Sequence, residues 1–77
     1  MLHIEILRPD KVVHRGKADL IILPGKAGKF GVMSGHMNMM TTLTSRFISV
    51  DSTVFNCNGG FCQVTQIGDY TECKVLL

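Results

Sequence analysis

Apolar and polar residues alternate along most of this chain, in short runs separated by turn residues. At the start, Leu2, Ile4 and Ile6 are apolar, while His3 and Glu5 between them are polar. This period of two is typical of a β-strand with one buried face. No window shows the i, i+3, i+4, i+7 spacing of an amphipathic helix. The pattern therefore predicts an all-β fold, a small two-sheet β-sandwich or flattened barrel that hides one face of each strand.

The positions of the other strands follow from aliphatic runs and turn signals. A short strand is expected from Val12 to Gly16, and another from Ala18 to Leu23, which is aliphatic except at Asp19, as in a strand covered on both faces. Turns are expected at Asp51-Ser52, Asn58-Gly59-Gly60 and Gly68-Asp69. The remaining expected strands occupy residues 30–33, 39–43, 47–50, 53–57, 61–65 and 71–77. The prediction is one domain over residues 1–77 with about eight to ten short strands.

Size and charge narrow the class of protein. The chain has 77 residues, a net charge of +2 and 45% hydrophobic residues. A chain of this length should expose roughly 4,700 Å² when folded, and its stability alone should be marginal. The composition excludes a disordered chain and a strongly basic nucleic-acid arm. The basic run from Arg8 to Lys17 carries no aromatic residue, so nucleic acid is not an expected partner.

No hydrophobic segment is long enough to cross a bilayer. The longest aliphatic run, from Leu20 to Leu23, stops at Pro24. It is far shorter than a membrane span or the core of a signal peptide. The chain is therefore expected to be soluble, without direct insertion into a membrane.

The three cysteines are Cys57, Cys62 and Cys73, an odd number without a C-x-x-C pair. They are expected to be half-buried apolar residues in a reducing compartment. Two alternatives stay open: a disulfide between Cys57 and Cys62, and a zinc site made of the cysteines and a histidine. Neither a catalytic triad nor a carboxylate pair nor a cofactor motif is readable, so neither an active site nor a cofactor is expected.

The segment from Gly25 to Gly35 is rich in glycine and contains Lys26 and Lys29. It lacks the Gly-x-x-x-x-Gly-Lys-Ser/Thr pattern, and no helix follows it, which argues against phosphate binding. Its glycines are expected to permit bends between short strands. Methionines then cluster, and such a soft apolar patch suits either an irregular core or an adaptable interface. They are Met33, Met37, Met39 and Met40.

Two motifs carry a family resemblance. One contains Gly25, Gly28, Gly31, Val32 and the pair Gly35-His36; the other is Asn58-Gly59-Gly60-Phe61-Cys62-Gln63-Val64. Over the whole chain, in register, these motifs resemble the epsilon subunit of F-type ATP synthases. That family has Gly-x-x-Gly-x-x-Gly-Val/Ile, Pro-Gly-His-Ala-Pro-Leu-Leu-Thr and Ser-Gly-Gly-Phe-x-Glu-Val at these places.

Several residues depart from the family pattern. Ser34 replaces the usual proline, and Lys29 stands where an acidic residue is common. Ser45-Arg46 replaces a Pro-Gly turn. Members of the family continue into a C-terminal helical hairpin that carries the inhibitory latch, and this hairpin is absent from the sequence up to Leu77.

The resemblance implies a non-catalytic rotor part of the central stalk. Such a β-sandwich would link the gamma subunit to the ring of membrane c subunits and so couple proton translocation to ATP synthesis. The implied c-ring contacts are Lys26, Lys29, Ser34, Gly35 and His36. The implied gamma contacts are Met37, Met39, Met40 and Thr42.

The same resemblance implies a peripheral location on the cytoplasmic side of a bacterial inner membrane, or on the matrix side of an organelle inner membrane. Weak self-association without gamma is expected from exposed strand edges and the methionine patch. Two rival functions remain: a stand-alone β-sandwich interaction module, and a small metal-binding protein that uses cysteine and histidine.

Overall fold

The computed structural model describes residues 1–35 and 38–77, which form strands joined by turns and bends. The strands in these residues are β1 (Leu2–Arg8), β2 (Lys11–Ala18), β3 (Ile21–Gly25), β4 (Gly28–Val32), β5 (Met39–Val50), β6 (Thr53–Ile67) and β7 (Tyr70–Leu76). The prediction of an all-β fold is confirmed. The expected count of about eight to ten strands is wrong, because seven strands account for the described residues.

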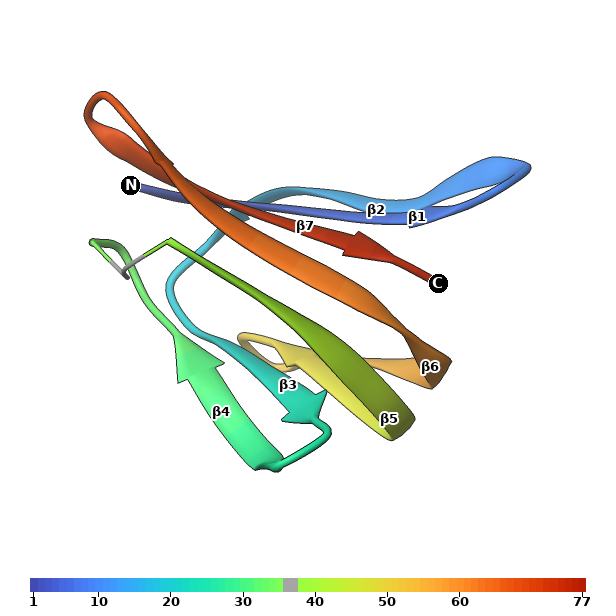
Figure 1. The fold of residues 1–77 in the computed structure, drawn as a ribbon. Coiled ribbons are helices and arrows are strands. Elements are labelled where there is room, and N and C mark those ends of the chain that lie inside the picture. Colours follow the sequence, from blue (N-terminus) through green and yellow to red (C-terminus); the bar gives the residue numbers. More distant parts are fainter. Residues whose placement is uncertain (36–37) are drawn as a thin grey trace.

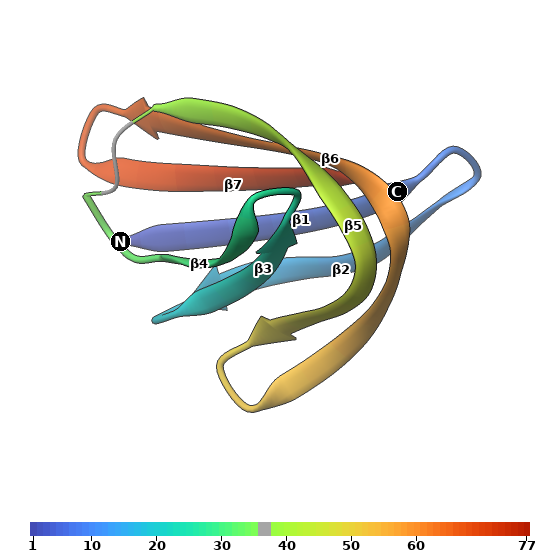
Figure 2. The same ribbon diagram turned by 60° about the horizontal axis from the view of Figure 1, so that its bottom comes forward.

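The strands form one hydrogen-bonded sheet in the order β2-β1-β7-β6-β5-β3-β4. Neighbouring strands are antiparallel except β1 and β7, which are parallel. The sheet folds over itself into two layers, with β1, β2 and β7 above β3 and β4 (Figure 1). Seen from another side, the long strands β5 and β6 curve together from one layer to the other (Figure 2). The predicted sandwich is confirmed, but continuous strands join its two layers.

A glycine bend lets β6 pass between the layers. Gly59 and Gly60 have positive φ values of 94° and 149°, which residues with a side chain rarely adopt. On both sides of the bend β6 keeps the same neighbour, since Cys62 pairs with Thr41 and Cys57 pairs with Arg46 on β5. The turn predicted at residues 58–60 is therefore wrong. The strands expected at residues 39–43 and 47–50 are two parts of the single strand β5. Those expected at residues 53–57 and 61–65 are likewise two parts of β6.

The chain also crosses between the layers after β2. The single strand predicted from Ala18 to Leu23 is wrong, because β2 ends at Ala18 and β3 begins at Ile21. Asp51, at the β5–β6 turn with a φ of 53°, holds this crossing. Its Oδ1 accepts hydrogen bonds of 3.0 Å from the backbone nitrogens of Asp19 and Leu20. One turn thus fixes where the next strand enters the second layer.

The core lies between the layers and is filled by the inward face of each strand. As the alternation predicted, Leu2, Ile4 and Ile6 are buried, and from the other layer Ile21 and Leu23 are completely buried. The accessible surface is 4741 Å², close to the area expected from chain length. Both outer strands of the sheet, β2 and β4, have one free edge. In residues 1–35 and 38–77 we find no helix with the length and hydrophobicity needed to cross a membrane.

The bend makes a prediction about Gly60. A Cβ at this position would collide with the carbonyl oxygen of Leu76, and the positive φ would add strain. Gly60→Ala should therefore lower the free energy of unfolding by roughly 2–4 kcal/mol, measured by urea denaturation. Gly16→Ala is the matched control, since its nearest neighbour would be the His14 ring at 3.9 Å. Equal stability of the two variants would contradict the bend.

Candidate interaction surfaces

Two of the predicted c-ring contacts, Lys26 and Lys29, lie at the turn between β3 and β4. Gly25 pairs with Gly28 there, and a Cβ on Gly25 would lie 2.9 Å from the ring of Phe30. The turn is tight because this position has no side chain. The Lys26 backbone nitrogen donates to Thr42 O on β5 over 3.1 Å. Both lysine side chains are exposed.

Ser34 and Gly35 follow the other end of β4 and are held by a polar network. The Gly35 nitrogen donates to Thr71 Oγ1 over 2.8 Å, and this hydroxyl donates to Gln66 Oε1 over 2.6 Å. Thr71 is completely buried. The amino group of Met1 donates to Ser34 Oγ over 2.8 Å. The network therefore ties this segment to β1, β6 and β7.

The described c-ring contacts consequently form two groups. Lys26 and Lys29 lie at one end of β4, whereas Ser34 and Gly35 lie beyond the other end (Figure 1). The strand of five residues keeps them roughly 16 Å apart. The sequence grouped these residues as one set of contacts, but β4 lies between the two groups and separates them. His36 lies outside the described residues, so its role stays a prediction.

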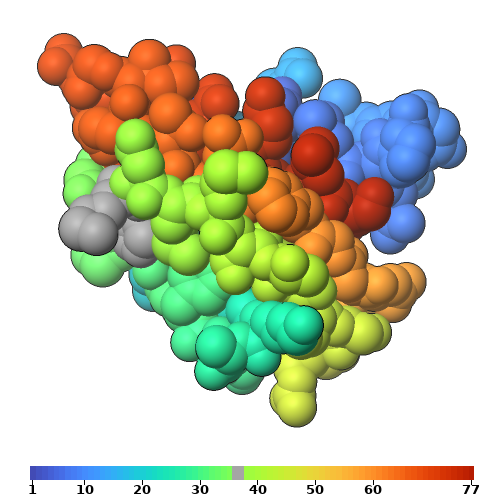
Figure 3. All heavy atoms as spheres, viewed as in Figure 1, coloured from blue at the N-terminus to red at the C-terminus, as the bar shows by residue number. Residues whose placement is uncertain are grey.

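The predicted gamma contacts on β5 divide between its two faces. Met40 is 63% exposed, and Thr42, two residues on, is exposed on the same side. Met39 is half-buried and packs against the core. The first half of β5 forms an uncovered band between β4 and β6 (Figure 3). Met37 lies outside the described residues. The methionine cluster thus contributes both to the core and to the surface.

The three cysteines are free and buried. Cys57 Sγ lies 3.4 Å from Thr44 O, whereas Cys62 Sγ lies 3.7 Å from Cys73 Sγ. The alternative of a 57–62 disulfide is therefore wrong, and the expected half-burial is too low. The hydrogen bond with Cys73 lowers the pKa of Cys62, while the same bond, burial and the nearby Cys62 charge raise the pKa of Cys73. These thiols behave as core residues.

No group of three or more His, Cys, Asp or Glu side chains in the described part of the chain is placed to hold a metal ion. Charged pairs are also few: the one salt bridge in residues 1–35 and 38–77 joins Arg15 and Glu5 across β1 and β2, with an N–O distance of 2.7 Å. The features that stand out in the described residues are exposed contact surfaces.

A cleft that the sequence did not predict opens where the ladder between β3 and β5 is interrupted. Ile22 pairs with Ser49, and the next pair is Gly25 with Leu43. Between these two pairs, residues 23–24 of β3 lie opposite residues 44–48 of β5. Two residues cannot form ladder hydrogen bonds with all five. A cleft of about 670 Å³ results, and a neighbouring one of about 470 Å³ shares three of its residues. The shared residues are Lys29, Ser45 and Arg46.

The hydrogen bonds between Gly35, Thr71 and Gln66 predict that a substitution of Thr71 lowers the stability of the fold. Thr71→Val keeps the shape of the side chain but leaves the Gly35 nitrogen and Gln66 Oε1 without this partner. We expect a loss of roughly 1–3 kcal/mol in the free energy of unfolding, measured by urea denaturation. Thr53→Val, at an exposed strand end, should change stability little. A similarly small effect at Thr71 would rule out the network.

The buried thiols predict slow labelling. In native buffer a thiol-specific dye should react slowly with all three cysteines, and in denaturant all three should react fast. Ser52→Cys adds a thiol at an exposed turn and should react at once in native buffer. Fast native labelling of the unmodified chain would show that the cysteines are not enclosed.

Comparison with known proteins identifies the family. Residues 1–74 match the model of the ATP synthase delta/epsilon chain β-sandwich domain. The ATP synthase epsilon chain of Parvibaculum lavamentivorans is 32% identical over 73 residues, covering 87% of this chain and 54% of the relative. That of Caulobacter vibrioides is 34% identical over 67 residues, covering 82% and 78%. The chain spans about half the length of several curated relatives that it matches.

Solved structures show the same fold. A chain of the Euglena gracilis mitochondrial ATP synthase, OSCP/F1/c-ring, has a TM-score of 0.82 at 19% identity, covering 95% of this chain and 48% of that one. A chain of the Tetrahymena thermophila mitochondrial ATP synthase central stalk/c-ring has a TM-score of 0.74 at 13% identity, covering 99% and 63%. Because residues 1–74 match the family model, this chain belongs to the ATP synthase delta/epsilon family and contains its β-sandwich domain.

Proposed function

We propose that this chain is a non-catalytic subunit of the central stalk of an F-type ATP synthase. It would join the gamma subunit to the c ring, so that rotation driven by proton translocation reaches the catalytic subunits. The observation that carries this proposal is the family match over residues 1–74 on a completely strand-built sandwich. The fold is also that of chains in structures named for the c-ring and the central stalk.

The fold suits a part that transmits torque. Its two layers share the continuous strands β5 and β6, which pair from Met39 with Val64 to Val50 with Thr53. Sliding of one layer over the other would break this ladder and disturb a close-packed core. Such a body would pass on a force with little deformation.

The c-ring contact is best supported at Ser34 and Gly35, and the predicted contact at His36 lies outside the described residues. The Gly35 nitrogen donates to the hydroxyl of the buried Thr71, and the exposed amino group of Met1 donates to Ser34 Oγ, so the segment is held in place against β7. An exposed segment held in this way suits binding, because little conformational entropy is lost. Lys26 and Lys29 would require a separate contact, since β4 lies between the two groups.

The gamma contact is best supported on the outer face of β5. Met40 is 63% exposed beside the exposed Thr42, and a flexible methionine suits an adaptable apolar interface. Met39 packs inward, so it would support the strand rather than dominate the contact. The predicted contact at Met37 lies outside the described residues.

The subunit would be peripheral to the membrane. The matched relatives include bacterial and mitochondrial ATP synthase chains. We therefore place this chain on the cytoplasmic side of a bacterial inner membrane, or on the matrix side in an organelle.

Calorimetric titration with the gamma subunit from the same source tests the proposal. We expect one-to-one binding, and Met40→Glu should weaken it by about tenfold or more, because the charge would be desolvated in the interface. Val12→Glu is the matched control, since Val12 is 49% exposed on the edge strand β2. It should leave the affinity unchanged.

Two outcomes would count against the proposal. If the folded chain does not bind gamma at tens of micromolar, the stand-alone interaction module becomes the better reading. If Met40→Glu and Val12→Glu weaken binding equally, the contact is not on β5. Ser34→Trp should leave gamma binding intact but reduce binding of the chain–gamma complex to c rings, which separates the two contacts.

A further inference from the structure

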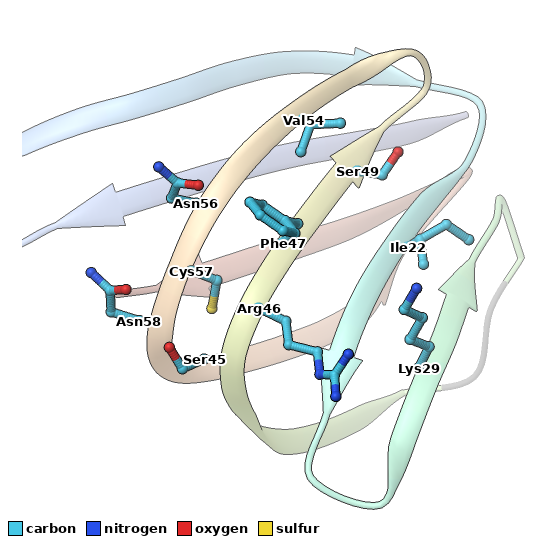
Figure 4. Close-up of a pocket in the computed structure, with 10 residues that line it drawn as sticks. All are labelled: Ile22, Lys29, Ser45, Arg46, Phe47, Ser49, Val54, Asn56, Cys57 and Asn58. Atoms are coloured by element: carbon cyan, nitrogen blue, oxygen red, sulfur yellow. The ribbon is translucent and has the colours of Figure 1, made fainter.

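The cleft beside the interrupted β3–β5 ladder combines two kinds of surface. Lys29 on β4 and Arg46 on β5 lie at one end, and Ile22, Phe47 and Val54 lie along the rest (Figure 4). Phe47 and Val54 are 63% and 60% exposed. Large apolar side chains that gather in a hollow of the surface mark a binding site more often than scattered ones do.

The cationic end has no neutralising partner in the described part of the chain. Lys26 joins Lys29 and Arg46 around the neighbouring cleft. None of the six carboxylate residues lines either cleft, and in the described residues these three cations form no ion pair and no side-chain hydrogen bond. Three positive charges without a neutralising partner line the neighbouring cleft, and two of them also line the first cleft. Such a group of charges attracts an anionic ligand.

The apolar part decides what kind of anion fits. A free phosphate would contact the cations alone and leave Phe47 and Val54 in water. A peptide that carries a bulky apolar residue between carboxylates would cover both parts at once. Asn56 and Asn58 on the β6 side of the cleft offer amide groups that suit an extended backbone.

We propose that this cleft binds an acidic peptide segment of a partner protein, with one bulky apolar side chain against Phe47 and Val54 and its carboxylates against Lys29 and Arg46. The site goes beyond the central-stalk role. It includes Lys29, at the opposite end of β4 from the Ser34 segment, so a bound peptide would leave the Ser34 segment free for the c ring.

The probe is a fluorescent peptide with phenylalanine flanked by glutamates, titrated into the full chain and followed by anisotropy. Lys29→Glu and Arg46→Glu should each weaken binding by about tenfold, and added salt should weaken it further. Lys11→Glu makes the same charge change at an exposed position on β2 and should have little effect. Phe47→Ser should weaken binding, whereas Val12→Ser, another exposed apolar site, should not.

Circular dichroism confirms that each variant is folded. Equal binding of a matched lysine–phenylalanine peptide, or equal effects of Arg46→Glu and Lys11→Glu, would overturn the proposal. The proposal would also be overturned if inorganic phosphate displaced the peptide and Phe47→Ser bound the peptide as tightly as the unmodified chain. These two results together would indicate a simple anion site. Binding of the gamma subunit is measured in a separate titration with different variants. Failure of the peptide to bind would therefore leave the central-stalk proposal untouched, and failure of gamma to bind would leave the peptide site untouched.

Discussion

The pairing of β5 with β6 through a glycine bend is the constraint on which the other features depend. With 12 and 15 residues, β5 and β6 are the longest of the described strands. They stay paired from one layer to the other, and Gly59 and Gly60 supply backbone angles that permit the bend. Each layer then contains one half of the same hairpin. Leu43, Cys57 and Cys62 are buried near the bend. The hydrophobic core of one layer is therefore continuous with that of the other. Neither layer can pack without the other.

The proposed contacts follow from this geometry. The start of β5 belongs to the layer that holds β7, and there it presents Met40 outward. The end of β5 belongs to the layer that holds β3, where the ladder is interrupted and Arg46 and Phe47 are exposed. One strand therefore carries two unlike surfaces, an apolar one near the Ser34 segment and a mixed cationic and apolar one in the other layer. The two surfaces therefore suit partners of different chemistry.

The sequence predicted the local pattern better than the long-range one. Alternation correctly identified the inward face of β1, because a period of two maps directly onto the two faces of a strand. It failed at Asn58-Gly59-Gly60, since the same residues favour a hairpin turn and a bend within a strand, and only pairing with β5 distinguishes them. The cleft was also missed. Arg46 and Lys29 are distant in sequence, and the register that brings them together depends on unpaired residues of β5.

The parallel pairing of β1 with β7 has a consequence for biosynthesis. Leu2 pairs with Thr71 and Leu7 with Leu76, so two neighbouring strands of the sheet come from distant parts of the chain. On the ribosome, β1 and β2 emerge first as a two-stranded hairpin, which is marginally stable in water. Its inner edge stays open until β7 has left the exit tunnel. That edge is therefore exposed while β3 to β6 are being synthesised, and its protection during this interval falls to the cell's chaperones.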